Sequence, residues 1–243
     1  MIKVKSGKIK SEKFSVLKGL KGGIVYTFGF VPIRSIILML SLISLMGMSY
    51  AVLMPVFAKE ILLGDSHTFG FLMGASGSGA LIGAIYMAFR KSVLGLDRII
   101  PLSAALFGGG IIAFSLSRYF MLSLIIMILT GFAMIMQLTS SNTLLQTIVD
   151  DDKRGRVMSF YTMAFVGTAP FGSLLAGALA NSLGAPDTLI IGGISCILGA
   201  AIFTSKLPSL KKMVHPIYLK LGIIPEVASG IQAATELTVP PEK

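Results

Sequence analysis

The sequence predicts an all-α membrane protein with six transmembrane helices and both ends in the cytoplasm, and three observations support this fold class. First, 54% of the 243 residues are apolar and 13% are charged, with a mean hydropathy of +0.84. Soluble domains usually carry about a quarter charged residues, and one soluble core of this size could not hide so much apolar surface. Second, the charges are separated by six long uncharged stretches. Third, lysine and arginine are divided unequally between the segments that connect these stretches.

The uncharged stretches define the expected spans, with His67 counted as a boundary. In chain order they are Ser35–Ala58, Thr68–Phe89, Ile99–Ser117, Tyr119–Val149, Val157–Pro186 and Thr188–Ser205. Even the shortest, the last, holds 18 residues, and a helix needs about 17–25 to cross the hydrocarbon. Helices satisfy their own backbone groups in lipid, and the apolar runs lack the alternation of a membrane barrel.

The distribution of basic residues predicts the orientation. Of the 21 lysines and arginines, all but Lys59 and Arg118 lie on the side that carries both termini. Lysine and arginine accumulate in cytoplasmic loops, so we expect a multi-pass protein of the inner (plasma) membrane. The net charge of +10 therefore reflects topology, and we expect the lipid bilayer, not nucleic acid, as its partner.

Two flanking segments enclose the expected bundle at 35–206. In residues 1–34, apolar side chains recur at helical spacing among lysines, at Phe14, Leu17, Leu20 and Ile24. This pattern indicates an amphipathic cytoplasmic helix on the anionic inner leaflet, although a solvated basic linker fits equally well. We expect the cytoplasmic tail, 207–243, to be partly disordered.

Small residues and one proline mark expected helix-packing and kink positions. Pairs of small residues four apart let helix backbones approach closely, and a proline inside a span removes a backbone hydrogen bond. These positions are Gly74, Gly79, Gly83, Gly167, Pro170, Gly172 and Gly177. Packing explains most of them, and rocking of loosely interlocked helices is the functional alternative.

The cytoplasmic half of the fourth span is unusually polar. Polar side chains at membrane depth usually face a bundle interior or a watery cavity, and Asn142 and Gln146 share one helix face. The candidate cavity-lining residues are Tyr50, Gln137, Ser141, Asn142, Gln146 and Tyr161. Bonding between helices, or emergence of the span from the membrane, explains the same pattern.

The spans lack ionisable groups. Every aspartate, glutamate and histidine lies outside them, and Cys196, inside the last span, is the single cysteine. An intramembrane enzyme needs buried acids, a metal cluster or a Ser/His pair, so we expect no enzyme, metal or cofactor. We interpret Cys196 as a small packed hydrophobe.

Three segments carry a family resemblance: the loop at 90–98, the motif Asp-Lys-Arg-Gly-Arg-Val-Met-Ser at 152–159, and the Gly/Pro-rich run at 167–177. Together they resemble the C-terminal half of a major facilitator superfamily transporter, in the branch of secretion effectors that includes enterobactin-exporter-like and macrolide-efflux-like proteins. The loop at 90–98 is a degraded match, because the Gly-Arg-Arg of the family does not follow Arg98.

The resemblance implies a twelve-helix transporter built from two six-helix halves. This chain would be the second half, with residues 1–34 as the end of the central loop. Spans one, two, four and five would line the cavity, and spans three and six would face lipid. A second half, or a second copy of the chain, would be the partner, and a small solute would be the cargo. The other half would supply the acid for proton coupling.

The same resemblance suggests a cytoplasmic gate that closes when the cavity opens outward. Its candidate residues are Asp97, Arg98, Asp152, Arg154 and Arg156. Topology anchoring is the alternative for the arginines, and capping of the fifth helix is the alternative for Asp152. A truncated or non-transporting membrane subunit is the competing function, and a channel ranks lowest because no filter-like loop appears.

Overall fold

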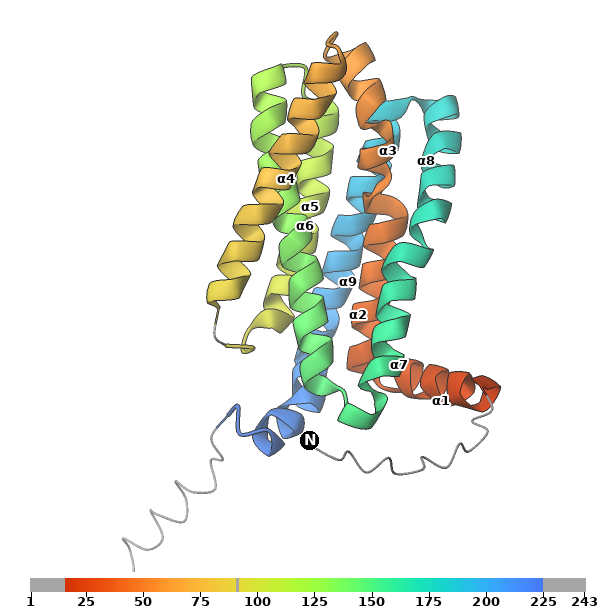
Figure 1. Cartoon of the computed structure of the whole chain (residues 1–243), viewed down its shortest axis with the longest axis vertical. Coiled ribbons are helices and arrows are strands. Elements are labelled where there is room, and N and C mark those ends of the chain that lie inside the picture. Colours follow the sequence, from red (N-terminus) through yellow and green to blue (C-terminus); the bar gives the residue numbers. More distant parts are fainter. Residues whose placement is uncertain (1–15, 91, 225–243) are drawn as a thin grey trace, which may run out of the picture.

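The computed structural model describes residues 16–90 and 92–224, and within these ranges it contains helices and no strands. Six of its helical segments are long and apolar enough to cross a membrane: Val31–Ile61, Ser66–Phe89, Leu96–Leu116, Phe120–Ile148, Asp151–Leu183 and Ala185–Lys220. They form one bundle of roughly parallel segments (Figure 1). The predicted all-α fold class and all six spans are therefore confirmed, whereas the cytoplasmic placement of both ends stays a prediction.

Two of the six spans are interrupted by π-helical segments. The first span consists of α2 (Val31–Leu42), η1 (Ile43–Gly47), α3 (Ser49–Val56) and η2 (Phe57–Ile61). The fifth consists of α7 (Asp151–Thr162), η3 (Met163–Gly167) and α8 (Ala169–Leu183). The other four are continuous: α4 (Ser66–Phe89), α5 (Leu96–Leu116), α6 (Phe120–Ile148) and α9 (Ala185–Lys220).

Two of the three π-segments, η2 and η3, lie next to prolines, which lack a backbone donor. Pro170 lies in the first turn of α8, just after η3, and Pro55 lies inside α3, just before η2. A π-segment leaves carbonyl groups free for other partners, and one of them is used here. Ser44 in η1 donates a hydrogen bond of 2.5 Å to the Phe165 carbonyl in η3, which joins the two interrupted spans.

Glycines set the tightest helix contacts. A Cβ atom at Gly79 of α4 would overlap the Ile128 carbonyl of α6, and one at Gly131 of α6 would overlap the Ser76 carbonyl of α4. Similarly, a Cβ at Gly172 of α8 would overlap the Leu45 carbonyl of η1. These backbones touch with no room for a side chain, as small-residue packing in membranes predicts.

The two flanks extend the bundle at the end where α2 begins. The described flank before the first span is α1 (Val16–Gly29), which runs across this end of the bundle (Figure 1). Its residues 24, 25 and 28 are exposed hydrophobics. The expected apolar residue Phe14 lies outside the described residues.

The last helix continues well beyond the expected span. Thr188–Ser205 was the predicted extent, but α9 runs to Lys220, so the start of the expected tail is helical. Leu210, Val214 and Tyr218 are buried on one face, and this apolar face holds the extension against the bundle. The expectation of disorder beyond it falls on 225–243, outside the described residues.

Candidate functional site

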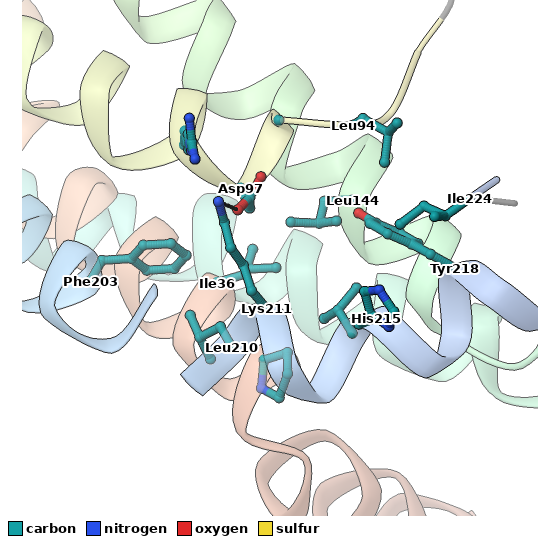
Figure 2. A pocket seen from close by; sticks show the side chains of 14 residues that line it. Ile36, Leu94, Asp97, Leu144, Phe203, Leu210, Lys211, His215, Tyr218 and Ile224 are labelled. Atoms are coloured by element: carbon teal, nitrogen blue, oxygen red, sulfur yellow. Dashed lines mark ion pairs between the residues drawn. The ribbon is translucent and has the colours of Figure 1, made fainter. Parts of the chain in front are cut away.

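An ion pair joins the start of α5 to the extension of α9. The Asp97 carboxylate lies 3.2 Å from the Lys211 ammonium, and 21% and 41% of these side chains are exposed. Gly95 precedes α5 with a φ of 83°, a left-handed conformation that favours glycine, so the chain turns sharply into the helix that carries Asp97. Figure 2 shows the pair at the edge of a cavity.

The cavity has a volume of about 490 Å³ and lies between α2, α5, α6 and α9. Its walls are mainly apolar, with Ile36, Leu144 and Phe203 among them. The polar groups come from the α5 start and the α9 extension: Asp97, Arg98, Lys211, His215 and Tyr218. Such a size and such a lining are typical of small-molecule sites.

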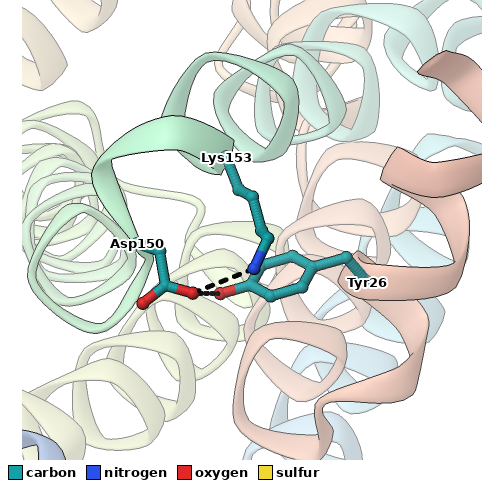
Figure 3. A network of polar contacts seen from close by, with 3 residues as sticks. All are labelled: Tyr26, Asp150 and Lys153. Atoms are coloured by element: carbon teal, nitrogen blue, oxygen red, sulfur yellow. Dashed lines mark hydrogen bonds and ion pairs between the residues drawn. The ribbon is translucent and has the colours of Figure 1, made fainter.

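A second polar cluster joins α1 to the turn between α6 and α7. The Lys153 ammonium lies 3.1 Å from Asp150 Oδ2, and the Tyr26 hydroxyl donates to the same oxygen at 3.3 Å. The ammonium also lies 4.5 Å from the centre of the Tyr26 ring, within the range of cation–π attraction. Figure 3 shows the three side chains converging.

The pKa values of Asp150 and Tyr26 in this cluster are both shifted. The hydrogen bond from Lys153, followed by its positive charge, lowers the pKa of Asp150 below the usual 3.8. Burial raises the pKa of Tyr26 above 10.0. Asp150 therefore stays ionised and Tyr26 stays neutral across the physiological range, so Tyr26 remains a hydrogen-bond donor.

The gate candidates are distributed unevenly over these clusters. Asp97 forms the pair with Lys211, and Arg98 lines the adjacent cavity. Arg154 pairs with Asp151 at 2.5 Å within α7. Asp152 and Arg156 are exposed on the same helix. Asp152 lies inside the first turn, since the N-cap position is Asp150, so the capping interpretation of Asp152 is wrong.

The cavity-lining candidates gather along α6. The Gln137 side-chain amide donates to Ser141 Oγ at 3.1 Å, and both side chains are buried. Gln146 donates to the Asn142 side chain, which confirms that they share a face. The Tyr161 hydroxyl of α7 donates to the Leu138 carbonyl at 3.0 Å.

Tyr50 lies apart from this group. Its buried hydroxyl is 3.4 Å from Ser76 Oγ of α4 and 3.8 Å from the Met134 sulfur of α6. Gln146 is exposed and Asn142 is half-buried, whereas Tyr50, Gln137 and Ser141 are buried inside the bundle. The assignment of these residues to a solute cavity stays a prediction.

The packing candidates divide into two groups. Gly79, Gly83 and Gly172 approach a neighbouring helix closely, whereas a Cβ at Gly74 or Gly177 would meet open space. A Cβ at Gly167 would touch the side chain of Met163 in its own span. The open positions therefore leave small-residue surface uncovered by the described chain.

The sequence analysis did not identify Lys211 as the partner of Asp97, or Tyr26 and Lys153 as the partners of Asp150. Lys211 counted only toward the charge bias, because its pairing with Asp97 joins two helices and depends on the fold. The spacing of three between Asp150 and Lys153, on one helix face, was a signal that could have found that pair. Tyr26 carried no such signal.

Comparison with known proteins gives one family. Residues 2–219 match the sequence model described as transmembrane secretion effector. The staphyloferrin A transporter of Staphylococcus aureus is 29% identical over 170 residues, 70% of this chain and 42% of that protein. An uncharacterised transporter of the major facilitator type from Bacillus subtilis, YfmI, is 27% identical over 205 residues, 83% of this chain and 50% of its own length. The chain thus spans about half the length of these relatives. No solved structure matches it significantly.

Proposed function

The chain belongs to the transmembrane secretion effector family of the major facilitator superfamily, and from this premise we propose that it is one six-helix half of a solute exporter. A second six-helix half completes the central cavity, and the two halves rock to expose it to either side in turn. The competing proposal is a membrane subunit that does not transport alone.

The uncovered small-residue surface carries this proposal. On α4, Gly70, Gly74 and Gly77 are exposed at helical spacing, and a Cβ at each would meet open space. On α7, Gly155, Ser159 and Thr162 are exposed on one face. Glycine offers little side-chain surface for contact with lipid, whereas it allows the backbone of a neighbouring helix to approach closely. We therefore assign these two faces to contacts with the second half.

The hydroxyl groups on these faces suit a moving contact. Ser159 donates to the Gly155 carbonyl at 2.9 Å, and Thr162 donates to the Met158 carbonyl at 3.1 Å. Both are satisfied within their own helix, so separation of the halves leaves no unpaired donor. The faces can part and rejoin at low cost, as rocking requires.

The cytoplasmic gate follows from the two charged clusters. Asp97–Lys211 and Tyr26–Asp150–Lys153 both lie at the end of the bundle where the described chain begins and ends. Partly exposed ion pairs contribute about 0–1 kcal/mol, so such pairs can exchange partners as the halves move. The basic bias of the sequence supports placing this end in the cytoplasm.

We base the proposed class of solute on the name of one relative. The Staphylococcus aureus protein is named as a transporter of staphyloferrin A, and we propose a siderophore-like solute here. The candidate cavity side chains are neutral, so the charges of such a solute would be met by the second half. That half would also supply the acid for proton coupling.

Photo-crosslinking in native membranes tests whether a second six-helix half contacts the exposed faces of α4 and α7. A photoreactive residue replaces Gly74 of α4 or Thr162 of α7, and the matched control replaces Leu102 of α5, which is 70% exposed on a span expected to face lipid. We expect protein adducts from Gly74 and Thr162 and lipid adducts from Leu102. The partner is then identified, and siderophore efflux is measured in vesicles with and without it.

Two outcomes separate the competing functions. Adducts to a second membrane chain or a second copy, together with siderophore efflux that needs it, support the exporter. Lipid adducts from all three positions and no efflux support the non-transporting subunit and overturn the exporter.

A further inference from the structure

A groove runs between α2 and α9 on the outside of the bundle. Its walls are the apolar side chains Leu38, Met39, Leu42 and Ile202, and its volume is about 170 Å³. Gly199 also lines it, and a Cβ there would overlap the Leu42 side chain. The glycine therefore lets the Leu42 side chain pack closely against α9.

The groove is apolar along its length and basic at one end. Arg34 and Lys206 line that end, both side chains are exposed, and no ion pair joins either of them to another described residue. Leu42 lies eight residues from Arg34 along α2, so the apolar part extends for about 12 Å at 1.5 Å per residue. Leu38 and Ile202 are 54% and 59% exposed, so this face is open to the bilayer.

We propose that this groove binds one anionic phospholipid, with the phosphate on Arg34 and Lys206 and an acyl chain along Leu38, Leu42 and Ile202. Two cations at the head of an apolar channel match the two parts of such a lipid, and basic pockets between transmembrane helices on the cytoplasmic side are known to bind anionic head groups. A free phosphate would use only the basic end.

The site has a structural consequence for α9. Phe203 lines this groove and also the cavity beside Asp97 and Lys211. A lipid wedged between α2 and α9 would hold Phe203 in place and steady the extension that carries Lys211. The lipid site itself needs no transport activity, so it stands or fails separately from the proposed exporter.

Lipid retention and binding test the proposal on the full chain. The purified protein is mixed with vesicles of phosphatidylglycerol or of phosphatidylcholine, and bound lipid is counted by native mass spectrometry. The variant is Arg34→Gln/Lys206→Gln. The matched control is Lys59→Gln/Lys212→Gln, which removes the same charge away from the groove.

We expect one phosphatidylglycerol per chain and no retained phosphatidylcholine. Each basic residue near an anionic surface contributes about fivefold in affinity, so we expect a loss of roughly 30-fold in the groove variant. The control should keep its affinity within about twofold, and inorganic phosphate at millimolar concentration should not displace the lipid.

Three results would overturn the proposal. Equal loss in the groove and control variants would show a general charge effect. Displacement by inorganic phosphate alone would show an anion site without an acyl chain. Binding that appears only after Glu226, Glu236 and Glu242 are changed to glutamine would show that the tail of the chain occupies the groove.

Discussion

Asp97 and Lys211 approach to 3.2 Å, although Asp97 lies at the start of the third span and Lys211 lies in the last part of the sixth, more than 100 residues later in the chain. The pair therefore connects the first turn of α5 to the helical extension of α9. It also borders the cavity of about 490 Å³, so we expect that breaking the pair would widen access to that cavity.

Charge reversal tests the role of this pair in the gate. We expect Asp97→Lys to abolish most efflux in the assembled exporter while membrane insertion and amount stay unchanged. Because the pair is partly exposed, its loss should lower stability by no more than about 1 kcal/mol. Efflux and detergent-solubilised melting are the two measurements.

The double reversal Asp97→Lys/Lys211→Asp serves as the rescue, since it restores a pair of opposite charges. Glu60→Lys, at the opposite end of the bundle, is the matched charge change. Normal efflux in Asp97→Lys, or no recovery in the double variant, would remove the pair from the gate.

The Asp150 cluster predicts a pH dependence at its end of α7. The pKa of Asp150 is lowered in the folded chain by Lys153, so ionised Asp150 stabilises the fold at pH values above the unfolded pKa. This contribution is lost as the pH falls below the usual 3.8 and through the lowered pKa. We expect wild type to melt above Asp150→Asn at pH 6, and the difference to vanish under strong acid.

The melting difference is followed from pH 6 downward in detergent. Glu60→Gln is the control, because Glu60 forms no ion pair with a described residue. A difference between wild type and Asp150→Asn that is unchanged in acid would show that the Asp150 charge is not the stabilising group.

The positions of the spans could be predicted from the sequence, but the pairs of side chains that join different helices could not. Charges cannot lie in hydrocarbon without compensation, so gaps between them located all six spans. Span ends were less visible, because α9 continues to Lys220 on an apolar face interleaved with lysines. Helical periodicity there was visible, but its docking depended on α5.

The glycines show the same difference between what the sequence predicts and what depends on the fold. Sequence spacing identified Gly74 and Gly79 as equivalent small residues, yet Gly79 touches α6 and Gly74 meets open space. Which face of α4 turns toward α6 depends on rotation of the helix about its axis. Neither spacing nor composition records that rotation, and the π-segments that rotate the first and fifth spans were not predicted.

The different surroundings of Gly79 and Gly74 predict different losses of stability for the same substitution at two positions of α4. Gly79→Ala should destabilise the chain by about 1–3 kcal/mol, because the added Cβ overlaps the Ile128 carbonyl and forces α4 and α6 apart. Gly74→Ala adds the same methyl group in open space and should stay within about 0.5 kcal/mol of wild type. Unfolding in a denaturing detergent series measures both.

Equal destabilisation by the two alanines would contradict the packing of α4 on α6. In the assembled exporter Gly74→Ala should additionally weaken the association of the halves, since we place this face at their contact. Co-purification of the two halves measures that second effect.

The hydrogen bond between the two π-segments gives the last prediction. Ser44 Oγ donates to the Phe165 carbonyl at 2.5 Å, so Ser44→Ala should leave this carbonyl without its partner and loosen the first span from the fifth. Side-chain hydrogen bonds between membrane helices average about 0.6 kcal/mol, and we expect a loss of about 0.5–2 kcal/mol. The matched control is Ser159→Ala, because Ser159 donates within its own helix and its loss should change little. A Ser44→Ala variant that unfolds like the control would show that the first and fifth spans are held together by packing alone, with Gly172 of α8 against the Leu45 carbonyl of η1 as the remaining close approach.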